Sequence, residues 1–325
     1  MSDKLICNVE IRLASILYNR KCYIDTILLK IMVPEYSQIS PTAIFCARMR
    51  AKQNLPYSKE LINLLDIKYF KFIEDLPDYN KAPFHKSYFI PFIEGRYYSL
   101  NEALRQTLRH TKNVLIVELA SGLSTRGLNF AGKNIFYMET DLKKLIRLKE
   151  KIVIDIINNN RLNKSNHLFM SINPLVKKDV DRIGKYYLKY FANNKLIIIH
   201  EGLLMYLNKK EKTIFRDNIK YLFEKYACNG LWLSPDFSRT MNQFHGFKGK
   251  ENIRDKISKV TGRNFDYFKS LKEASKFVKD GKLKSRIISN KKIVSQLIRK
   301  KGFQFNYDAI LKSAEEYRVW KIELP

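Results

Sequence analysis

Cysteine is scarce in this chain, and its placement argues against metal binding and disulfide bonding. The four cysteines among 325 residues are Cys7, Cys22, Cys46 and Cys228, and no two of them have C-x-x-C spacing. Neither a zinc site nor a disulfide framework is therefore expected. No apolar run reaches the roughly 20 residues of a membrane helix, and the first residues lack the basic, apolar and small-residue order of a signal peptide. We expect a cytoplasmic protein with no metal site and no membrane span.

Acidic residues are scarce relative to basic ones. Lysine and arginine number 60 against 32 aspartates and glutamates, which gives a formal net charge of +28. A surface of this charge attracts nucleic acid or an anionic membrane. The lysines are spread along the chain instead of forming one run, and they accompany abundant Asn, Ile and Tyr, as an AT-rich genome would produce. Two interpretations stay open: a compositional origin, which the spread favours, and a nucleic-acid partner.

Glycine is also sparse, with 12 in the chain, and two common phosphate-binding motifs are missing. No G-x-G-x-x-G dinucleotide fingerprint is present, and no glycine-rich loop ends in Gly-Lys-Ser/Thr. Five small residues nevertheless lie between an apolar run and the next helical pattern: Ala120, Ser121, Gly122, Ser124 and Thr125. Small side chains let the backbone approach a ligand closely, although a tight strand–helix turn without a ligand has the same composition. Taken alone, the loop leaves both interpretations open.

Strand and helix patterns alternate over most of the chain, and 45% of the residues are apolar, enough for a sizeable core. Short apolar runs typical of strands buried on both faces are expected at residues 114–117, 135–138, 168–172, 195–199 and 231–234. Helical patterns cover residues 42–66, broken at Pro56, and 100–110, 142–158, 209–226 and 293–300. The alternation predicts an α/β fold with a mostly parallel sheet and right-handed crossovers.

The two ends of the chain are expected to build different parts of the molecule. Residues 1–100 are predicted to form a helical and aromatic cap over a pocket, with 75–96 as an irregular connection rich in proline and aromatic residues. Residues 101–325 are predicted to form the main domain, interrupted at 238–290 by a charged, helical lid insertion with few strand signals. Segments 303–307 and 318–324 are expected to close the sheet as an antiparallel pair.

Two acidic residues follow the second expected strand, in the sequence Met-Glu-Thr-Asp at 138–141. Carboxylates at this position accept hydrogen bonds from ribose hydroxyls in nucleotide-binding folds. They also stabilise the N-terminus of a following helix through its dipole, without any ligand. Position and chemistry together favour ribose binding for Glu139, Asp141 or both.

Three segments follow one another along the chain: ELASGLSTRG at 118–127, YMETDL at 137–142 with Lys149 seven residues on, and EGLLMYL at 201–207. In this order they resemble the leucine carboxyl methyltransferase family, and EGLLMYL is the most specific of the three. The resemblance extends back to PTAIFCARMRA at 41–51 and to Gly95-Arg96, so that it covers residues 41–237. The family includes protein phosphatase methyltransferases and bacterial polyketide-type O-methyltransferases.

The resemblance implies a Rossmann-like class I methyltransferase fold that binds S-adenosylmethionine. Matched position by position, it implies that the cofactor is held by Arg48, Arg96, Glu118, Ala120, Gly122, Glu139, Asp141, Asn173, Pro174 and Glu201. The chain departs from the residues frequent in the family where Ala120 replaces glycine, Ser124 and Asn173 replace aspartate, and Lys143 replaces proline. Asn173 keeps a hydrogen-bond acceptor but loses the charge.

These residue types suit the chemistry of the cofactor. Its methionyl carboxylate is expected to pair with the planar guanidinium of Arg96, with Arg48 assisting. The ribose hydroxyls are expected to donate hydrogen bonds to Asp141. The exocyclic amine of adenine is expected to donate to the side-chain carbonyl of Asn173, and the amino-acid moiety is expected to lie beside Glu201. Each side chain also has a purely structural explanation, but together they occur in the order of the family.

The expected reaction is an in-line transfer of the sulfonium methyl group to an acceptor oxygen, helped by positioning and by exclusion of water. A carboxylate acceptor is already ionised at neutral pH, whereas a hydroxyl needs a base. The candidate bases are His200, Tyr206 and Asp236, although His200 is equally placed to point into the core. The acceptor is expected to be a small molecule or a protein carboxylate, and the lysines and aromatic residues around the pocket suit an anionic one. The alternative is a basic nucleic-acid-binding protein that keeps the fold without catalysis.

Overall fold

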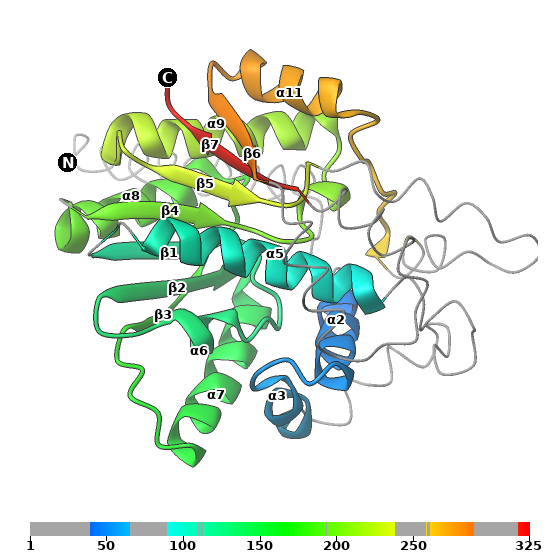
Figure 1. Cartoon of the computed structure of the whole chain (residues 1–325), viewed down its shortest axis with the longest axis vertical. Coiled ribbons are helices and arrows are strands. Elements are labelled where there is room, and N and C mark those ends of the chain that lie inside the picture. Colours follow the sequence, from blue (N-terminus) through cyan, green and yellow to red (C-terminus); the bar gives the residue numbers. More distant parts are fainter. Residues whose placement is uncertain are drawn as a thin grey trace, which may run out of the picture. The chain divides into compact units, whose positions relative to one another are not determined.

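Seven strands form one sheet in the order β3-β2-β1-β4-β5-β7-β6 (Figure 1). This computed structural model describes residues 40–65, 90–109, 111, 113–192, 194–237, 258, 261–288 and 318–325. The strands are β1 (Val114–Glu118), β2 (Ile135–Asp141), β3 (His167–Ser171), β4 (Lys195–Ile199), β5 (Leu231–Ser234), β6 (Lys284–Ile288) and β7 (Val319–Glu323). Strands β1 to β5 pair in parallel, and β7 is antiparallel to both of its neighbours. The Rossmann-like class I methyltransferase fold expected from the sequence is confirmed.

The central strands are largely apolar because helices cover both faces of the sheet. Helix α5 (Ile90–Leu108) covers one face, where its Leu100 and Leu104 pack in one core cluster with Ile116, Ile199 and Leu233 of β1, β4 and β5. All five residues of β1 are buried. Alternation along a strand sends the intervening side chains to the opposite face.

Helices α8 (Lys177–Phe191) and α9 (Lys209–Tyr226) pack against each other, and α9 lies on the opposite face of the sheet from α5. Trp232 of β5 alternates with two leucines that belong to the α5 cluster, and its ring contacts Phe215 of α9 with centroids 5.7 Å apart. The sequence did not predict α8, although its buried residues follow a helical spacing: Val180, Ile183, Gly184, Tyr187 and Phe191.

A second core cluster joins helices from distant parts of the chain. It contains side chains of α2 (Ser40–Lys52), α3 (Ser58–Leu64) and α7 (Lys143–Asn159), together with Tyr206 and Phe265. The helix predicted at 42–66 is thus two helices, separated around Pro56 as expected. The remaining elements are α6 (Arg126–Phe130), the 3-10 turn η4 (Leu204–Tyr206) and α11 (Leu271–Asp280).

Two sequence predictions about secondary structure are wrong. Helix α5 begins at Ile90, so that the end of the segment predicted as an irregular connection, 90–96, is helical and α5 crosses the boundary proposed at residue 100. The segment 284–288 inside the predicted helical lid is strand β6. Strand β6 is defined by its pairing with β7, and α5 packs against β1, β4 and β5. A local sequence pattern does not contain such contacts between distant segments.

The antiparallel pair that closes the sheet also differs from the prediction. Strand β7 pairs with β6 on one side and with β5 on the other. The partner predicted for it, 303–307, lies outside the described residues, as does the helix predicted at 293–300. Within the ranges given above, no helix is both long and apolar enough to cross a membrane.

The start of α9 offers a direct test of its local stabilisation. Asn208 accepts a hydrogen bond from the backbone N–H of Glu211 at 2.9 Å, and the Glu211 side chain accepts one from the N–H of Asn208, which together form a capping box. Asn208→Ala should lower the free energy of unfolding by about 1 kcal/mol because one N–H loses its acceptor. Urea unfolding measures this loss. Asn208→Ser, which keeps a cap, should lose much less, and an equal loss in both variants would contradict the role of the cap.

Candidate functional site

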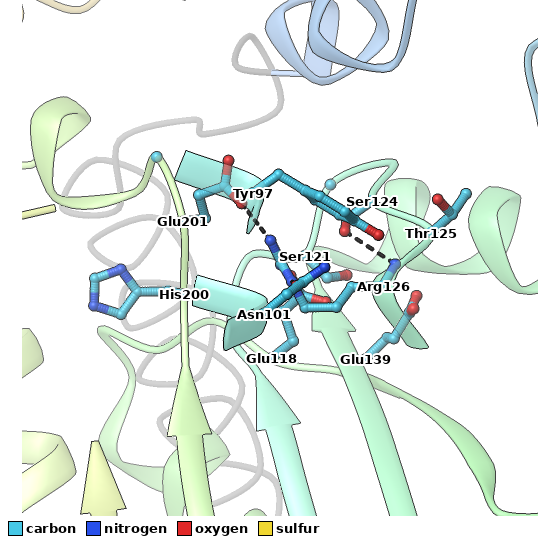
Figure 2. Close-up of polar contacts among 12 residues, drawn as sticks. Tyr97, Asn101, Glu118, Ser121, Ser124, Thr125, Arg126, Glu139, His200 and Glu201 are labelled. Atoms are coloured by element: carbon cyan, nitrogen blue, oxygen red, sulfur yellow. Dashed lines mark hydrogen bonds and ion pairs between the residues drawn. The ribbon is translucent and has the colours of Figure 1, made fainter. Parts of the chain in front are cut away.

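Candidate residues converge where the order of the strands reverses. Strands β1 and β4 are neighbours, with Glu118 in register with Ile199, and β2 lies on the other side of β1. Ligands of open α/β sheets bind outside the carboxyl ends of strands at such a switch point. Glu118 ends β1 and Glu201 follows β4, so both glutamates stand at this edge (Figure 2).

Arg126, the first residue of α6, joins these two glutamates. Its side chain is fully buried and forms ion pairs with Glu118 and with Glu201. Its Nε donates to Asn101 Oδ1 at 2.6 Å, and its guanidinium carbon lies 4.8 Å from the centre of the Tyr97 ring. Glu118 also accepts a hydrogen bond from the Tyr137 hydroxyl at 2.8 Å. The guanidinium is therefore engaged on every side (Figure 2).

A second arginine reaches Glu201 from helix α2. Arg50 Nη2 lies 3.2 Å from Glu201 Oε1, and both side chains are buried. Burial alone would raise the pKa of Glu201, but the positive charges of Arg50, Arg126 and Arg96 outweigh it, and the pKa is lowered. Glu201 is therefore ionised at neutral pH. Burial raises the pKa of the Cys46 thiol, which lies one helical turn before Arg50 and stays protonated.

Asp236, which follows β5, organises the turn after β4. Its carboxylate accepts hydrogen bonds from the backbone N–H groups of Gly202, Leu203 and Leu204 at 2.7–3.1 Å. Arg96 Nη2 pairs with the same carboxylate at 2.7 Å. Burial would raise the pKa of Asp236, but Arg96, His200 and the Gly202 N–H outweigh burial and lower it. A carboxylate with this many donors is an anchor for the turn, and its low basicity does not suit proton abstraction.

The other two candidate bases, His200 and Tyr206, lie near Asp236. His200 is fully buried, its Nδ1 lies 3.0 Å from Asp236 Oδ2, and its ring packs edge-on against Phe215. Figure 2 shows the ring directed away from Glu118 and Arg126. Burial raises the pKa of Tyr206 well above its usual value, so that this phenol stays protonated at neutral pH.

The small-residue loop after β1 adopts a conformation that favours glycine. Ala120 and Gly122 have φ values of +49° and +52°. The left-handed region costs an alanine free energy that a glycine does not lose, so Ala120 occupies a position where the glycine frequent in the resembled family would be relaxed. The loop is also tied to the connection between α2 and α3, because Thr125 Oγ1 donates to the carbonyl of Pro56 at 2.7 Å.

Asp141, at the end of β2, holds this loop against the next helix. One oxygen accepts the N–H of Gly122 at 2.8 Å and the other accepts the N–H of Leu142 at 2.7 Å. Burial raises the pKa of Asp141, and these two backbone donors act in the opposite direction. The carboxylate thus lies directly beside the left-handed turn, at the same edge of the sheet as Glu118.

Glu139 lies in a different environment from Asp141. Its side chain is fully buried and pairs with Lys149 Nζ at 2.5 Å and with His167 Nε2 at 3.1 Å. Burial would raise the pKa of Glu139, but Lys149 and His167 outweigh it and the pKa is lowered. Gly127 gives this cluster its space, since a Cβ there would lie 2.3 Å from His167 Nε2 and 2.4 Å from Glu139 Oε1.

Asn173 and Pro174 follow β3, next to Asp141. Asp141 is in register with Ser171, which places the turn after β3 beside the carboxylate. Asn173 Oδ1 accepts the N–H of Leu175 at 3.0 Å, and the Asn173 N–H donates to Asp179 Oδ2 at 2.8 Å. The side-chain carbonyl of Asn173 therefore already has one donor within the turn and retains a second lone pair.

The structure brings most of the predicted residues to one edge and adds two that the sequence analysis missed. Arg50 and Arg126 contact Glu201, whereas the predicted helper Arg48 is a partly exposed residue of α2. Arg126 lies in the STRG segment quoted for the resemblance, and an arginine among small loop residues was the signal that could have found it. In the part of the chain that the structure describes, no three acidic, histidine or cysteine side chains form a group able to hold a metal ion.

Comparisons with known proteins give similarity of fold only at low sequence identity. No family model matches the chain, and no curated protein matches it. Among solved structures, a DUF574 family protein from Streptomyces avermitilis is 9% identical, with a TM-score of 0.48 over 87% of this chain and 97% of that one. A magnesium protoporphyrin IX methyltransferase from Synechocystis, solved with bound S-adenosylhomocysteine, is 8% identical, with a TM-score of 0.44 over 79% of this chain and 94% of that one.

The lowered pKa of Asp236 predicts how acid affects stability. Because this carboxylate is more acidic in the folded than in the unfolded chain, its contribution is complete above the unfolded pKa of about 4 and is lost as the pH falls towards the folded value. Asp236→Asn should therefore be less stable than the wild type at pH 7, by about 3–5 kcal/mol for a broken buried pair. The deficit should shrink between about pH 5 and pH 2.

Urea unfolding across this pH range measures the deficit. Asp217→Asn is the matched control, because the Asp217 side chain is 52% exposed beside Arg216, and its small effect should hardly vary with pH. A deficit for Asp236→Asn that grows on acidification would contradict the assigned ionisation.

Proposed function

We propose that the chain is an S-adenosylmethionine-dependent methyltransferase that methylates an oxygen acceptor, and that it is related to the leucine carboxyl methyltransferases. The observation that carries the proposal is the arrangement at the carboxyl edge of β1, β2 and β4. There a left-handed turn of small residues, held by Asp141, lies beside a buried set of arginines and carboxylates. This arrangement offers separate partners for the nucleoside and for the amino-acid end of the cofactor.

The charges of the site suit the zwitterionic end of the cofactor. Arg50, Arg96 and Arg126 are balanced by Glu118, Glu201 and Asp236 in buried ion pairs. A ligand that carries one carboxylate and one ammonium can enter such a set by exchange of partners, without leaving a buried charge unpaired.

Arg50 is the arginine best placed for this exchange. It has one ion pair, whereas Arg126 uses three donor nitrogens. We assign the cofactor carboxylate to Arg96 and Arg50, and the ammonium to the ionised Glu201. Arg126 then keeps Glu201 in place.

The nucleoside end is assigned to the neighbouring strand ends. Asp141 takes the ribose hydroxyls, with the backbone of Ala120–Gly122 approaching the ligand closely, and Asn173-Pro174 faces the adenine. Glu139 is left out of the contacts because Lys149 and His167 occupy its buried carboxylate. The support is the register that puts Asp141 next to the turn after β3.

The chemistry follows from alignment. A lone pair of the acceptor oxygen forms the new bond to the methyl carbon as the carbon–sulfur bond breaks, and its electrons remain on sulfur in S-adenosylhomocysteine. Arg50 on α2 and Arg96 on α5 bring the helices that precede β1 to the site, and we place the acceptor on the side of these two helices.

The properties of the three candidate bases support one class of acceptor. Asp236 is held by many donors, Tyr206 stays protonated and His200 is turned into the core. These properties favour a carboxylate acceptor, on a small molecule or a protein, since it needs no base.

Cofactor binding tests the proposal directly. In isothermal titration calorimetry, the full chain should bind S-adenosylhomocysteine with saturation. Arg96→Ala and Asp141→Asn should each weaken binding roughly ten- to hundredfold, because each removes charge-assisted hydrogen bonds. Arg105→Ala on the same helix, with a side chain 53% exposed, is the matched control and should bind as the wild type does. Folded wild-type protein that binds no S-adenosylhomocysteine would overturn the proposal.

Methyl transfer with labelled S-adenosylmethionine identifies the acceptor. Cell extracts and peptide libraries incubated with the enzyme should yield a labelled ester, which mild base hydrolyses, because a carboxylate is the favoured acceptor. Mass spectrometry distinguishes a methyl ester on a small acid from one on a protein. Label that survives base treatment, as a methyl ether or a methylated nucleotide would, contradicts the carboxylate assignment.

A further inference from the structure

The peptide unit between Ser121 and Gly122 is held at both of its polar ends by charged side chains. A trans peptide directs its C=O and N–H in opposite directions. The carbonyl of Ser121 accepts a hydrogen bond from Lys149 Nζ at 3.4 Å, and the N–H of Gly122 donates to Asp141 Oδ2 at 2.8 Å. A cation thus faces the negative end of this one peptide dipole, and an anion faces its positive end.

The backbone on either side of this peptide makes its orientation easy to lose. Gly122, whose φ of +52° follows this peptide directly, is left-handed, and so is Ala120 one residue before Ser121, with φ of +49°. Glycine occupies positive and negative φ almost equally well, so the plane of the Ser121–Gly122 peptide can rotate at low cost once its contacts are removed. A rotation would direct a carbonyl oxygen towards Asp141 where an N–H now lies.

The side chain of Lys149 is held in place beneath the loop. Its side chain is fully buried on α7 and pairs with Glu139 at 2.5 Å, and Glu139 is held in turn by His167. Gly127 leaves the space that these side chains fill. A buried ammonium needs every available acceptor, and the Ser121 carbonyl is the acceptor that Lys149 has besides the Glu139 carboxylate. The cluster therefore connects α7, β2 and β3 to one peptide of the loop.

We infer that Lys149 is a positioning residue for the cofactor: it keeps the Ser121–Gly122 peptide in its orientation when the ribose binds to Asp141. This inference rests on the proposed function. Ribose hydroxyls compete with the Gly122 N–H for the carboxylate of Asp141, so that the hydrogen bond from this N–H weakens as the ligand binds. Lys149 maintains the hold on the other end, and the loop keeps the shape that admits the nucleoside.

The test removes the lysine without leaving its partner charged. In Glu139→Gln/Lys149→Met both charges of the pair disappear together, which buried pairs tolerate far better than the loss of one partner. By calorimetry, S-adenosylhomocysteine should bind this variant about tenfold more weakly than the wild type, the size of one lost charge-assisted hydrogen bond. Methylthioadenosine, which keeps the ribose and lacks the amino acid, should weaken by the same factor. With an identified acceptor, KM for S-adenosylmethionine should rise while kcat is preserved.

Lys212→Met is the matched control, because Lys212 is another buried lysine but binds Asp266 instead of a residue of the loop. Its affinity for S-adenosylhomocysteine should equal that of the wild type. Equal affinity of the double variant and the wild type would overturn the role of Lys149, as would equal weakening in Lys212→Met. Failure of the wild type itself to bind S-adenosylhomocysteine would instead contradict the proposed function.

Hydrogen exchange on the wild type keeps the inference testable even if the double variant does not fold. The Gly122 amide should be protected in the free protein and should stay protected when S-adenosylhomocysteine is bound. Exchange of this amide at the unprotected rate in the complex would show that the peptide turns on binding and would overturn the inference.

Discussion

The buried guanidinium of Arg126 is the contact on which the rest of the site depends. It bonds to Glu118 at the end of β1, to Glu201 after β4 and to Asn101 on α5, so that one side chain fixes two strand ends and a helix relative to one another. Charges buried this deeply stabilise a structure only when each has a partner in good geometry. These bonds therefore hold the strand ends in place at the edge where the proposed cofactor would bind its carboxylate to arginine and its ammonium to Glu201.

Balance of charge distinguishes this site from the surface of the molecule. The chain as a whole carries +28, yet the buried arginines at the strand ends are matched by carboxylates. Lysines elsewhere in the described residues include exposed ones, such as Lys185 and Lys276, which are 71% and 74% exposed and pair with Asp181 and Asp280. Surface charges of this kind contribute little to stability. The basic composition therefore does not explain the site, which suits a ligand that is itself a zwitterion.

Two features of the loop after β1 connect its sequence to its proposed task. Small residues permit the left-handed turn, and the charges of Asp141 and Lys149 select one orientation for the peptide within it. Without the charges, the peptide in the turn could adopt more than one orientation. Without the turn, the two charged side chains would not have this peptide between them. The motif residues Gly127 and Lys149, which contact no proposed part of the cofactor, are thus explained by the packing of the cluster beneath the loop.

Local sequence determined the elements, and tertiary structure decided their partners. Strands β4 and β5 and helix α9 were predicted to the residue, because apolar periodicity and a capping box are properties of neighbouring residues. The pairing of β7 with β6 was not predicted, since strand pairing depends on segments far apart in the chain. Arg48 and Arg50 look equivalent in sequence, but two residues along a helix are about 200° apart around its axis, and only packing decides which arginine faces Glu201. Glu139 and Asp141 differ for the same reason. Alternation along β2 sends both side chains to one side of the strand. Their partners there differ, because Glu139 pairs with Lys149 and Asp141 accepts backbone N–H groups, and these partners give the two carboxylates different tasks.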